Sequence, residues 1–204
     1  VDSLLYSGDS VRLKETTQLR AQAFRNGKAS GDPGTALYIE STVKAEHDLP
    51  VVVIDDYGAG KPGKVDFEDA AVMTFEPGSR TGTTNLSYAP VMATRGGIHL
   101  HGQSSSKFDK TPYRLELWDN DDGDADYPFL GMPTDSDWVF RGPFLDKTLI
   151  HDAFTYSMGR DMGLQAPRFT LCEMYVNLDG GPVTSADYMG VYVASETVKV
   201  SEER

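Results

Sequence analysis

The stretch RGGIHLHGQSSSKFDKTPYRLELW, which spans Arg95–Trp118, predicts a β-hairpin. We expect the rest of the chain to support this hairpin. In its first part Ile98 and Leu100 point to one face, and alternation with a period of two is typical of a half-buried strand. A second alternating run covers Tyr113–Leu117. The small polar residues Gly102–Ser106 lie between the two runs and predict the loop that connects the strands.

The loop and the lysine that follows it suggest a binding function. Backbone N–H groups and hydroxyls in such a loop can hold phosphate oxygens, and the ammonium of Lys110 adds a positive charge where the second strand begins. The same residue types are common in ordinary turns. The pattern alone therefore leaves both interpretations open.

The hairpin resembles the signature hairpin of the CotH family of spore-coat-type protein kinases. The resemblance continues, in the order and spacing of that family, through PFLGMPTDSDWVFRGPFLDKTLIHDAFTYSMGRDMG, LCEMYVNLDGG and YMGVYVASETVKV. It covers roughly Leu49–Val200. It implies a kinase-like N-terminal lobe that binds ATP with Mg²⁺ and serves the phosphorylation of a protein substrate.

The resemblance also implies roles for individual residues. Loop residues Gly102, Ser104, Ser105 and Ser106 would cover the phosphates, and Lys110 would bind them.

Two glutamates complete the implied nucleotide site. Glu173 lies among apolar residues and needs a partner, so an ion pair between Lys110 and Glu173 is expected. Glu196 on the last strand is expected near the nucleotide base. The alternatives are that Glu173 accepts a bond from neighbouring backbone, that Lys110 is solvated and that Glu196 is a surface residue.

In the family, the metal-binding aspartates and the catalytic acid follow the last of these segments. This chain ends at Arg204. We therefore expect an N-terminal lobe that has no catalytic residue of its own, is inactive alone and needs a C-terminal lobe or downstream segment as its partner. The resemblance further implies an extracellular or cell-surface location.

Composition excludes several classes of protein. The chain has 204 residues, a net charge of −12 and 39% hydrophobic residues, which is enough for a folded core. The acidic balance argues against nucleic acid and anionic membranes as partners. No apolar run is long enough for a membrane span. Cys172 is the only cysteine, so no internal disulfide can form.

The first part of the chain predicts strands of a separate module. Short strand-like segments separated by turn residues cover Leu4–Tyr6, Val11–Leu13, Thr17–Phe24 and Thr35–Ile39. They resemble the end of the immunoglobulin-like module found at the C-terminus of chitobiases and hexosaminidases. Residues 1–44 are therefore expected to form a partial β-sandwich, and residues 45–204 the main domain. Alternatively, the four strands belong to the sheet of the main domain.

The predicted fold class is α+β, with a mostly antiparallel sheet and one main helix. The helix is expected at Lys147–Met162, with Asp146 as its N-cap. Further strands are expected at Leu49–Ile54, Ala70–Phe75, Asp137–Arg141, Phe169–Val176 and Gly190–Val200. The segment YGAGKPGK lacks the spacing and the following helix of a true phosphate-binding P-loop.

Two further patterns suggest metal ligands. Asp119, Asp121 and Asp124 surround a glycine and suggest a calcium loop, although a solvated acidic loop is the more common outcome. His99 and His101 share one face of a strand, but no third ligand lies nearby in the sequence.

A second hypothesis belongs to another functional class. The chain would be a non-catalytic β-module that binds cell-surface polysaccharide through the aromatic faces of Trp118 and Trp138. Aromatic side chains at the ends of strands more often belong to a core, so the kinase-like hypothesis ranks first.

Overall fold

The predicted hairpin is confirmed in the computed structural model, which describes residues 5–199. Strand β9 (Met92–Leu100) pairs with β10 (Tyr113–Trp118) in antiparallel register, and Leu115 lies opposite Ile98. Both side chains are fully buried. The alternating apolar residues of the hairpin therefore lie on the inner face of the sheet, as the sequence predicts.

The hairpin is part of a closed barrel. The strands follow one another around it in the order β10-β13-β15-β14-β6-β7-β9. The other members are β6 (Val51–Asp55), β7 (Glu68–Phe75), β13 (Asp137–Arg141), β14 (Phe169–Asn177) and β15 (Tyr188–Glu196). All their pairings are antiparallel except that of β6 with β14. The mostly antiparallel α+β class is confirmed, but the sequence analysis did not foresee closure of the sheet.

Two apolar clusters hold the barrel wall from both sides. The inner cluster fills the barrel with residues such as Trp138 and Tyr192, both of which are fully buried. A smaller outer cluster joins Val51 and Val53 to Tyr175 and Val183. Because both faces of β6 are covered, every residue of that strand is buried, as its continuous apolar run predicts.

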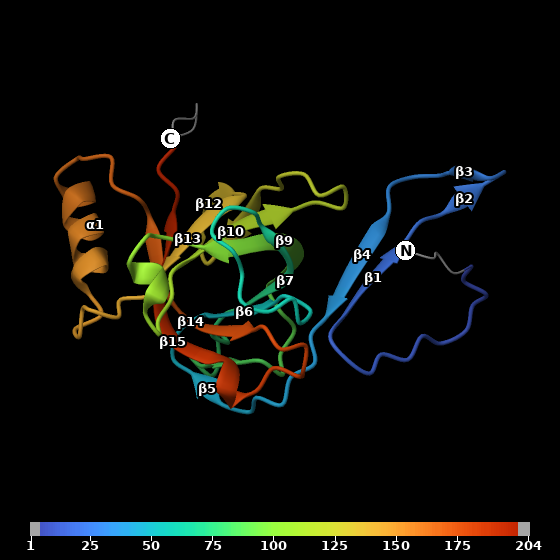
Figure 1. Cartoon of the computed structure of the whole chain (residues 1–204), viewed down its shortest axis with the longest axis horizontal. Helices are drawn as coiled ribbons and strands as arrows, with labels where there is room; N and C mark the ends of the chain where they lie inside the picture. Colours follow the sequence, from blue (N-terminus) through green and yellow to red (C-terminus); the bar gives the residue numbers. More distant parts are fainter. Residues whose placement is uncertain (1–4, 200–204) are drawn as a thin grey trace.

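The N-terminal segment forms a long arm of paired strands, and its expected likeness to an immunoglobulin-like module stays a prediction. Strands β1 (Thr17–Ala21) and β4 (Gly34–Tyr38) pair with each other, and β2 (Phe24–Arg25) pairs with β3 (Lys28–Ala29) at the tip. The arm extends to one side of the barrel (Figure 1). The expected strand at Val11–Leu13 is wrong. The expected strand at Leu4–Tyr6 does not form at Leu5 and Tyr6, and Leu4 lies outside the described residues.

Helix α1 (His151–Asp161) lies on the opposite side of the barrel and is shorter than predicted (Figure 1). The Asp146 carboxylate accepts bonds from the backbone N–H groups of Thr148 and His151, so it organises a turn before the helix instead of capping it. Leu149, with φ of 61°, interrupts the helical path there. Within residues 5–199, no helix has both the length and the apolar character required to span a bilayer.

The helix also buries less of its apolar stripe than its spacing suggests. Ala153 is buried, whereas Phe154 and Met158 are exposed. Packing against the barrel uses Tyr156, whose ring lies 6.0 Å from that of Phe169.

Short elements complete the fold. Strands β11 and β12 form a hairpin that the sequence analysis missed, and its turn residues Leu130 and Gly131 both have positive φ. The remaining elements are β5 (Glu46–His47), β8 (Thr84–Asn85), η1 (Ser105–Lys107), β11 (Tyr127–Phe129), β12 (Met132–Asp135) and η2 (Ser185–Asp187).

Candidate functional site

One end of the barrel carries the loop and the lysine singled out by the sequence. Strand β9 finishes there at Leu100 and β10 begins there at Tyr113, so the segment 101–112 closes this end. Strand β15 also begins at this end, because Phe140 of β13 lies opposite Tyr113, and the next residue, Arg141, pairs with Val193 in antiparallel register. We call it the lysine end.

The ammonium of Lys110 is held at the mouth of the barrel. It donates a hydrogen bond of 2.9 Å to the carbonyl of Met189 and lies 4.8 Å from the centre of the Tyr192 ring. Burial lowers the pKa of the Lys110 ammonium. A lysine ammonium has three N–H donors, and none of the described carboxylates pairs with it.

Two glycines make room for this side chain. A Cβ atom at Gly142 would lie 2.8 Å from Cγ of Lys110, and one at Gly190 would lie 2.8 Å from its Nζ. Gly190 also has φ of 80°, a conformation that other residues rarely adopt. The residue that follows β13 and strand β15 therefore form a slot that a larger residue at either glycine position would fill.

The loop before Lys110 is shaped by its own contacts. The Ser106 hydroxyl is turned inward and donates to the carbonyl of Gln103, while Ser104 is exposed and Ser105 is half-buried. The Lys64 ammonium donates to the Gln103 carbonyl at 3.0 Å. Lys64 thus adds a second positive charge beside the loop. The segment YGAGKPGK, which contains Lys64, is no P-loop. It lies next to the loop Gly102–Ser106, which by resemblance would cover the phosphates.

The expected ion pair between Lys110 and Glu173 is wrong. Glu173 Oε2 lies 2.7 Å from Nδ1 of His47, and the Tyr188 hydroxyl donates to the same oxygen. His47 Nε2 in turn lies 3.1 Å from the hydroxyl of Tyr175. This His47–Glu173 cluster lies on the outer wall of the barrel, whereas Lys110 reaches the inner mouth. It fastens β5 to β14 and β15.

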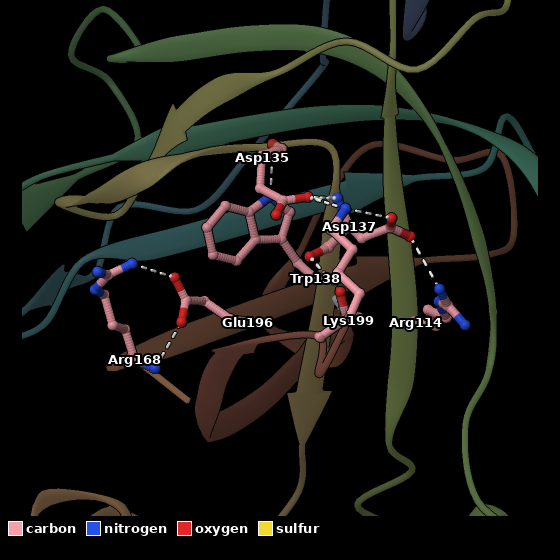
Figure 2. A network of polar contacts seen from close by, with 8 residues as sticks. Arg114, Asp135, Asp137, Trp138, Arg168, Glu196 and Lys199 are labelled. Atoms are coloured by element: carbon pink, nitrogen blue, oxygen red, sulfur yellow. Dashed lines mark hydrogen bonds and ion pairs between the residues drawn. The ribbon is translucent and has the colours of Figure 1, made fainter. Parts of the chain in front are cut away.

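Glu196 lies at the other end of the barrel. Met189 and Glu196 are near opposite ends of β15, so about 20 Å of strand separates Glu196 from the Lys110 contact. The Glu196 carboxylate accepts 2.9 Å bonds from the backbone N–H and the guanidinium of Arg168 (Figure 2). The structure therefore does not bring Glu196 together with the other proposed nucleotide contacts.

A network of ion pairs surrounds this second end (Figure 2). Lys199 lies between Asp135 and Asp137, at 2.7 and 3.0 Å, and Arg114 pairs with the other oxygen of Asp137. The hydrogen bonds from Lys199 and Arg114 outweigh burial and lower the pKa of Asp137. The network fixes the segment that leaves β15 against the start of β13.

The three aspartates proposed for calcium do not form a metal site. Asp119 accepts hydrogen bonds from the backbone N–H groups of Asp121 and Gly123, which closes its own loop. Nowhere in residues 5–199 do three or more His, Cys, Asp or Glu side chains gather in a way that could hold a metal ion. These residues therefore do not fit Mg²⁺ on their own either.

The two tryptophans of the second hypothesis differ in their burial, since Trp138 belongs to the inner cluster and Trp118 is half-buried. Trp138 is fully buried and stacks on Phe129 at 4.9 Å between ring centres. Trp118 packs edge-on against Phe67, and its indole N–H donates to Glu116. Trp138 therefore presents no open face on which a sugar could stack.

One buried carboxyl near the lysine end lacks a full set of partners. Asp56 is 2% exposed; its Oδ1 accepts from the backbone N–H of Gly58, and its Oδ2 has no hydrogen-bond partner among the described residues. Burial raises the pKa of Asp56 to about 6. Nothing in the sequence marked this residue.

Asp56 is expected to make stability depend on pH. Its folded-state pKa lies above the ordinary value of 3.8, so its contribution to stability is complete below about pH 4 and is lost as the pH rises through about 6. Urea unfolding of the parent chain and of Asp56→Asn should therefore diverge by about 2–3 kcal/mol between these limits, with the parent chain losing stability. Parallel pH profiles would contradict this assignment.

Sequence reasoning also missed residues that shape the site. His47 precedes the predicted strand by only a few residues and gave no signal of its own. Lys64 lies in a segment with a recognisable signal, because glycines and lysines follow a buried strand there. The sequence analysis compared that segment only with a P-loop and so missed its position beside the loop. Tyr192, which contacts the Lys110 ammonium, lies inside a segment identified by resemblance.

Comparison with known proteins supports the resemblance of the hairpin region. A family model described as CotH kinase protein matches residues 98–204, just over half of the chain. The matched part includes the loop, Lys110, helix α1 and both ends of β15. No curated protein matches the chain significantly.

Proposed function

The chain belongs to the CotH kinase protein family, and from that premise we propose that its lysine end holds the phosphate groups of a nucleoside triphosphate for a kinase-like phosphotransfer. The proposal rests on the surroundings of the Lys110 ammonium. A half-buried ammonium without a carboxylate partner is held in a slot between two glycines. Such a charge is costly to bury unless an anion compensates it.

The geometry leaves this ammonium able to bind an anion. One of its three donors goes to the Met189 carbonyl, so two remain for phosphate oxygens. The Tyr192 ring supports the cation through its face. In this partly desolvated position, attraction to a phosphate is stronger than it would be in bulk water.

Neighbouring groups can share the triphosphate charge. Lys64 lies against the loop, and the exposed Ser104 and half-buried Ser105 offer hydroxyls on it. Gly102, with φ of 78°, lets the chain turn sharply at the start of the loop. We propose that Gly102–Lys107 covers the phosphates, that Lys110 binds them and that Lys64 neutralises part of the remaining charge.

The rest of the reaction is proposed on the resemblance alone. The chemistry of phosphotransfer requires Mg²⁺ and a group that positions the attacking hydroxyl. The described residues do not fit Mg²⁺ on their own. We propose that a further segment or partner supplies these groups, that this part of the chain does not phosphorylate a protein substrate alone, and that it acts outside the cell.

The Lys110→Ala substitution is expected to weaken ATP binding to the full chain by about tenfold to a hundredfold, because a hydrogen bond to a charged group contributes about 1.5–3 kcal/mol. Isothermal titration calorimetry with and without Mg²⁺ measures this change. Lys28→Ala, which removes an equal charge from β3 of the arm, should leave the affinity unchanged.

Two results would contradict the proposal. The first is absence of binding heat from the parent chain at millimolar ATP. The second is an equal loss of affinity in Lys110→Ala and Lys28→Ala, which would indicate a diffuse charge effect. Circular dichroism of each variant separates lost binding from lost fold.

A further inference from the structure

Four basic side chains gather on the outer face of the barrel wall, beside the lysine end. Arg114 lies between Tyr113 and Leu115, which both belong to the inner cluster, so its side chain points outward. Arg141 ends β13 and follows the inner residue Phe140, so it points outward as well. We call the group the basic patch, and its members are His99, His101, Arg114 and Arg141.

The two histidines reach the same outer face from β9. His99 lies between Ile98 and Leu100, which are inner residues. The backbone N–H of His101 donates to the carbonyl of Pro112, so the pairing with the neighbouring chain continues past the end of β9 and keeps the alternation. Both rings therefore lie on the side of the wall that faces away from the barrel interior.

Strand register brings the four side chains close together. Arg114 lies directly opposite His99 on one side and opposite Val139, two residues before Arg141, on the other. Directly opposite Cβ atoms lie about 5 Å apart and diagonal ones about 7–8 Å apart, which arginine side chains can bridge. Burial lowers the pKa of the His101 ring most, and the positive charges of the other three members lower it further.

The tips of these side chains remain open to solvent. Arg141 is half-buried, and only its Nε is both enclosed and without a partner; its two terminal nitrogens are not enclosed and bond to no described residue. The ring nitrogens of His101 are in the same open state among residues 5–199. Arg114 donates from Nη2 to Asp137 and leaves Nη1 free of any described partner. Several N–H donors of the patch can therefore reach a ligand.

The basic patch contrasts with the acidic balance of the chain, which has 31 Asp and Glu residues against 19 Lys and Arg residues. In the described part of the chain, Asp137 is the one carboxylate that forms an ion pair with a member, through Arg114, and it is shared with Lys199. The patch therefore carries an excess of positive charge, which a bound anion would offset.

The geometry of the donors favours a phosphate group. A guanidinium presents its N–H groups as a planar fork that matches phosphate oxygens, and such bonds are stronger than those between neutral groups. The donors come from three neighbouring strands, and a tetrahedral dianion offers an oxygen to each direction. The net charge of −12 disfavours a nucleic acid as the source of this phosphate.

We propose that the basic patch binds the phosphate group of a phosphomonoester, with Arg141 and Arg114 donating to its oxygens and His101 beside them. The site is distinct from the proposed nucleotide site, because Lys110 lies over Tyr192 of the inner cluster and the barrel wall stands between.

The test is an NMR titration of the ¹⁵N-labelled full chain with inorganic phosphate and with O-phospho-L-serine. We expect saturable shifts in the Nε–H signal of Arg141 and in the ring signals of His101, with millimolar affinity. Arg141→Gln should weaken binding about tenfold or more, because it removes the hydrogen bonds of a charged donor. Arg25→Gln, the same change on exposed β2 at the tip of the arm, should leave the affinity unchanged.

Three outcomes would overturn the proposal. They are shifts that do not saturate with either probe, equal losses in Arg141→Gln and Arg25→Gln, and sodium acetate binding as tightly as phosphate. Saturation by O-phospho-L-serine alone would assign the site to a phosphorylated side chain, and saturation by both probes to the phosphate group itself.

Two variants separate this site from the proposed function. Arg141→Gln is expected to keep the ATP affinity of the parent chain, and Lys110→Ala is expected to keep the shifts of His101 on phosphate addition. If each variant lost both ligands, the patch would belong to the nucleotide site and the proposal of a distinct site would be wrong.

The pH dependence provides a readout that a purely structural role would not change. A bound dianion should raise the pKa of His101 by about 1, because an opposite charge nearby favours the protonated ring. Binding of sulfate, which stays doubly charged, should therefore tighten as the pH falls from about 7.5 to about 5.5. His101→Gln should lose this tightening; an unchanged pH profile in that variant would contradict the position of His101 in the site.

Discussion

Replacing His47 with alanine is expected to lower the free energy of unfolding by about 3–5 kcal/mol. The substitution leaves the Glu173 carboxylate, which is 9% exposed, without its 2.7 Å partner. It also removes the partner of the Tyr175 hydroxyl. Urea unfolding followed by tryptophan fluorescence measures the loss.

A double substitution identifies the origin of this loss. If the unpaired charge is responsible, Glu173→Gln in the His47→Ala background should recover part of the lost stability, since the amide is neutral. A His47→Ala variant as stable as the parent chain would show that Tyr188 alone satisfies the carboxylate. Equal losses in the single and double variants would assign the effect to packing of β5 instead.

Trp138→Ala is expected to destabilise the chain by about 3–5 kcal/mol, because removal of a large buried aromatic side chain leaves a cavity. The indole is fully buried, stacks on Phe129 and donates from Nε1 to the carbonyl of Asp135. Thermal and urea unfolding provide the measurement.

Two comparisons sharpen this expectation. Trp138→Phe should lose distinctly less stability because it retains most of the stacked ring, and Trp118→Ala should lose less because that indole is only partly buried. If Trp138→Ala kept its stability but lost polysaccharide binding, the residue would be a binding platform, as the second hypothesis requires.

Local patterns explain why much of the strand content could be predicted. Alternation in β9 and β10 and the apolar run of β6 depend on neighbours in sequence, and all three strands form where expected. Closure of the barrel depends instead on the parallel pairing of β6 with β14. No turn or spacing in the sequence records that contact.

The error over Glu173 has a simple physical cause. Cys172 and Met174 belong to the inner cluster, so alternation sends Glu173 to the outer face of β14. Lys110 lies over Tyr192, another member of the inner cluster. The barrel wall therefore separates the two charges. The resemblance identified both residues but carried no information about which face each would occupy.

The helix shows a different limit. Asp146 and the residues after it match the pattern of a capped helix, but the left-handed backbone of Leu149 delays the start to His151. An apolar stripe at helical spacing was found correctly, yet spacing does not show whether another element covers it. Phe154 and Met158 remain exposed among the described residues.

The parallel pairing of β6 with β14 joins strands that are far apart in the sequence. Asp55 and Asn177, which face each other at the end of this ladder, are separated by 122 positions along the chain. Contacts between such distant residues form slowly, because the loop entropy is lost before the contact is gained. During synthesis β6 can pair with β7 soon after both emerge, but its other edge stays open until β14 arrives. We therefore expect misassembly and aggregation to compete with the native state at the seam between these two strands.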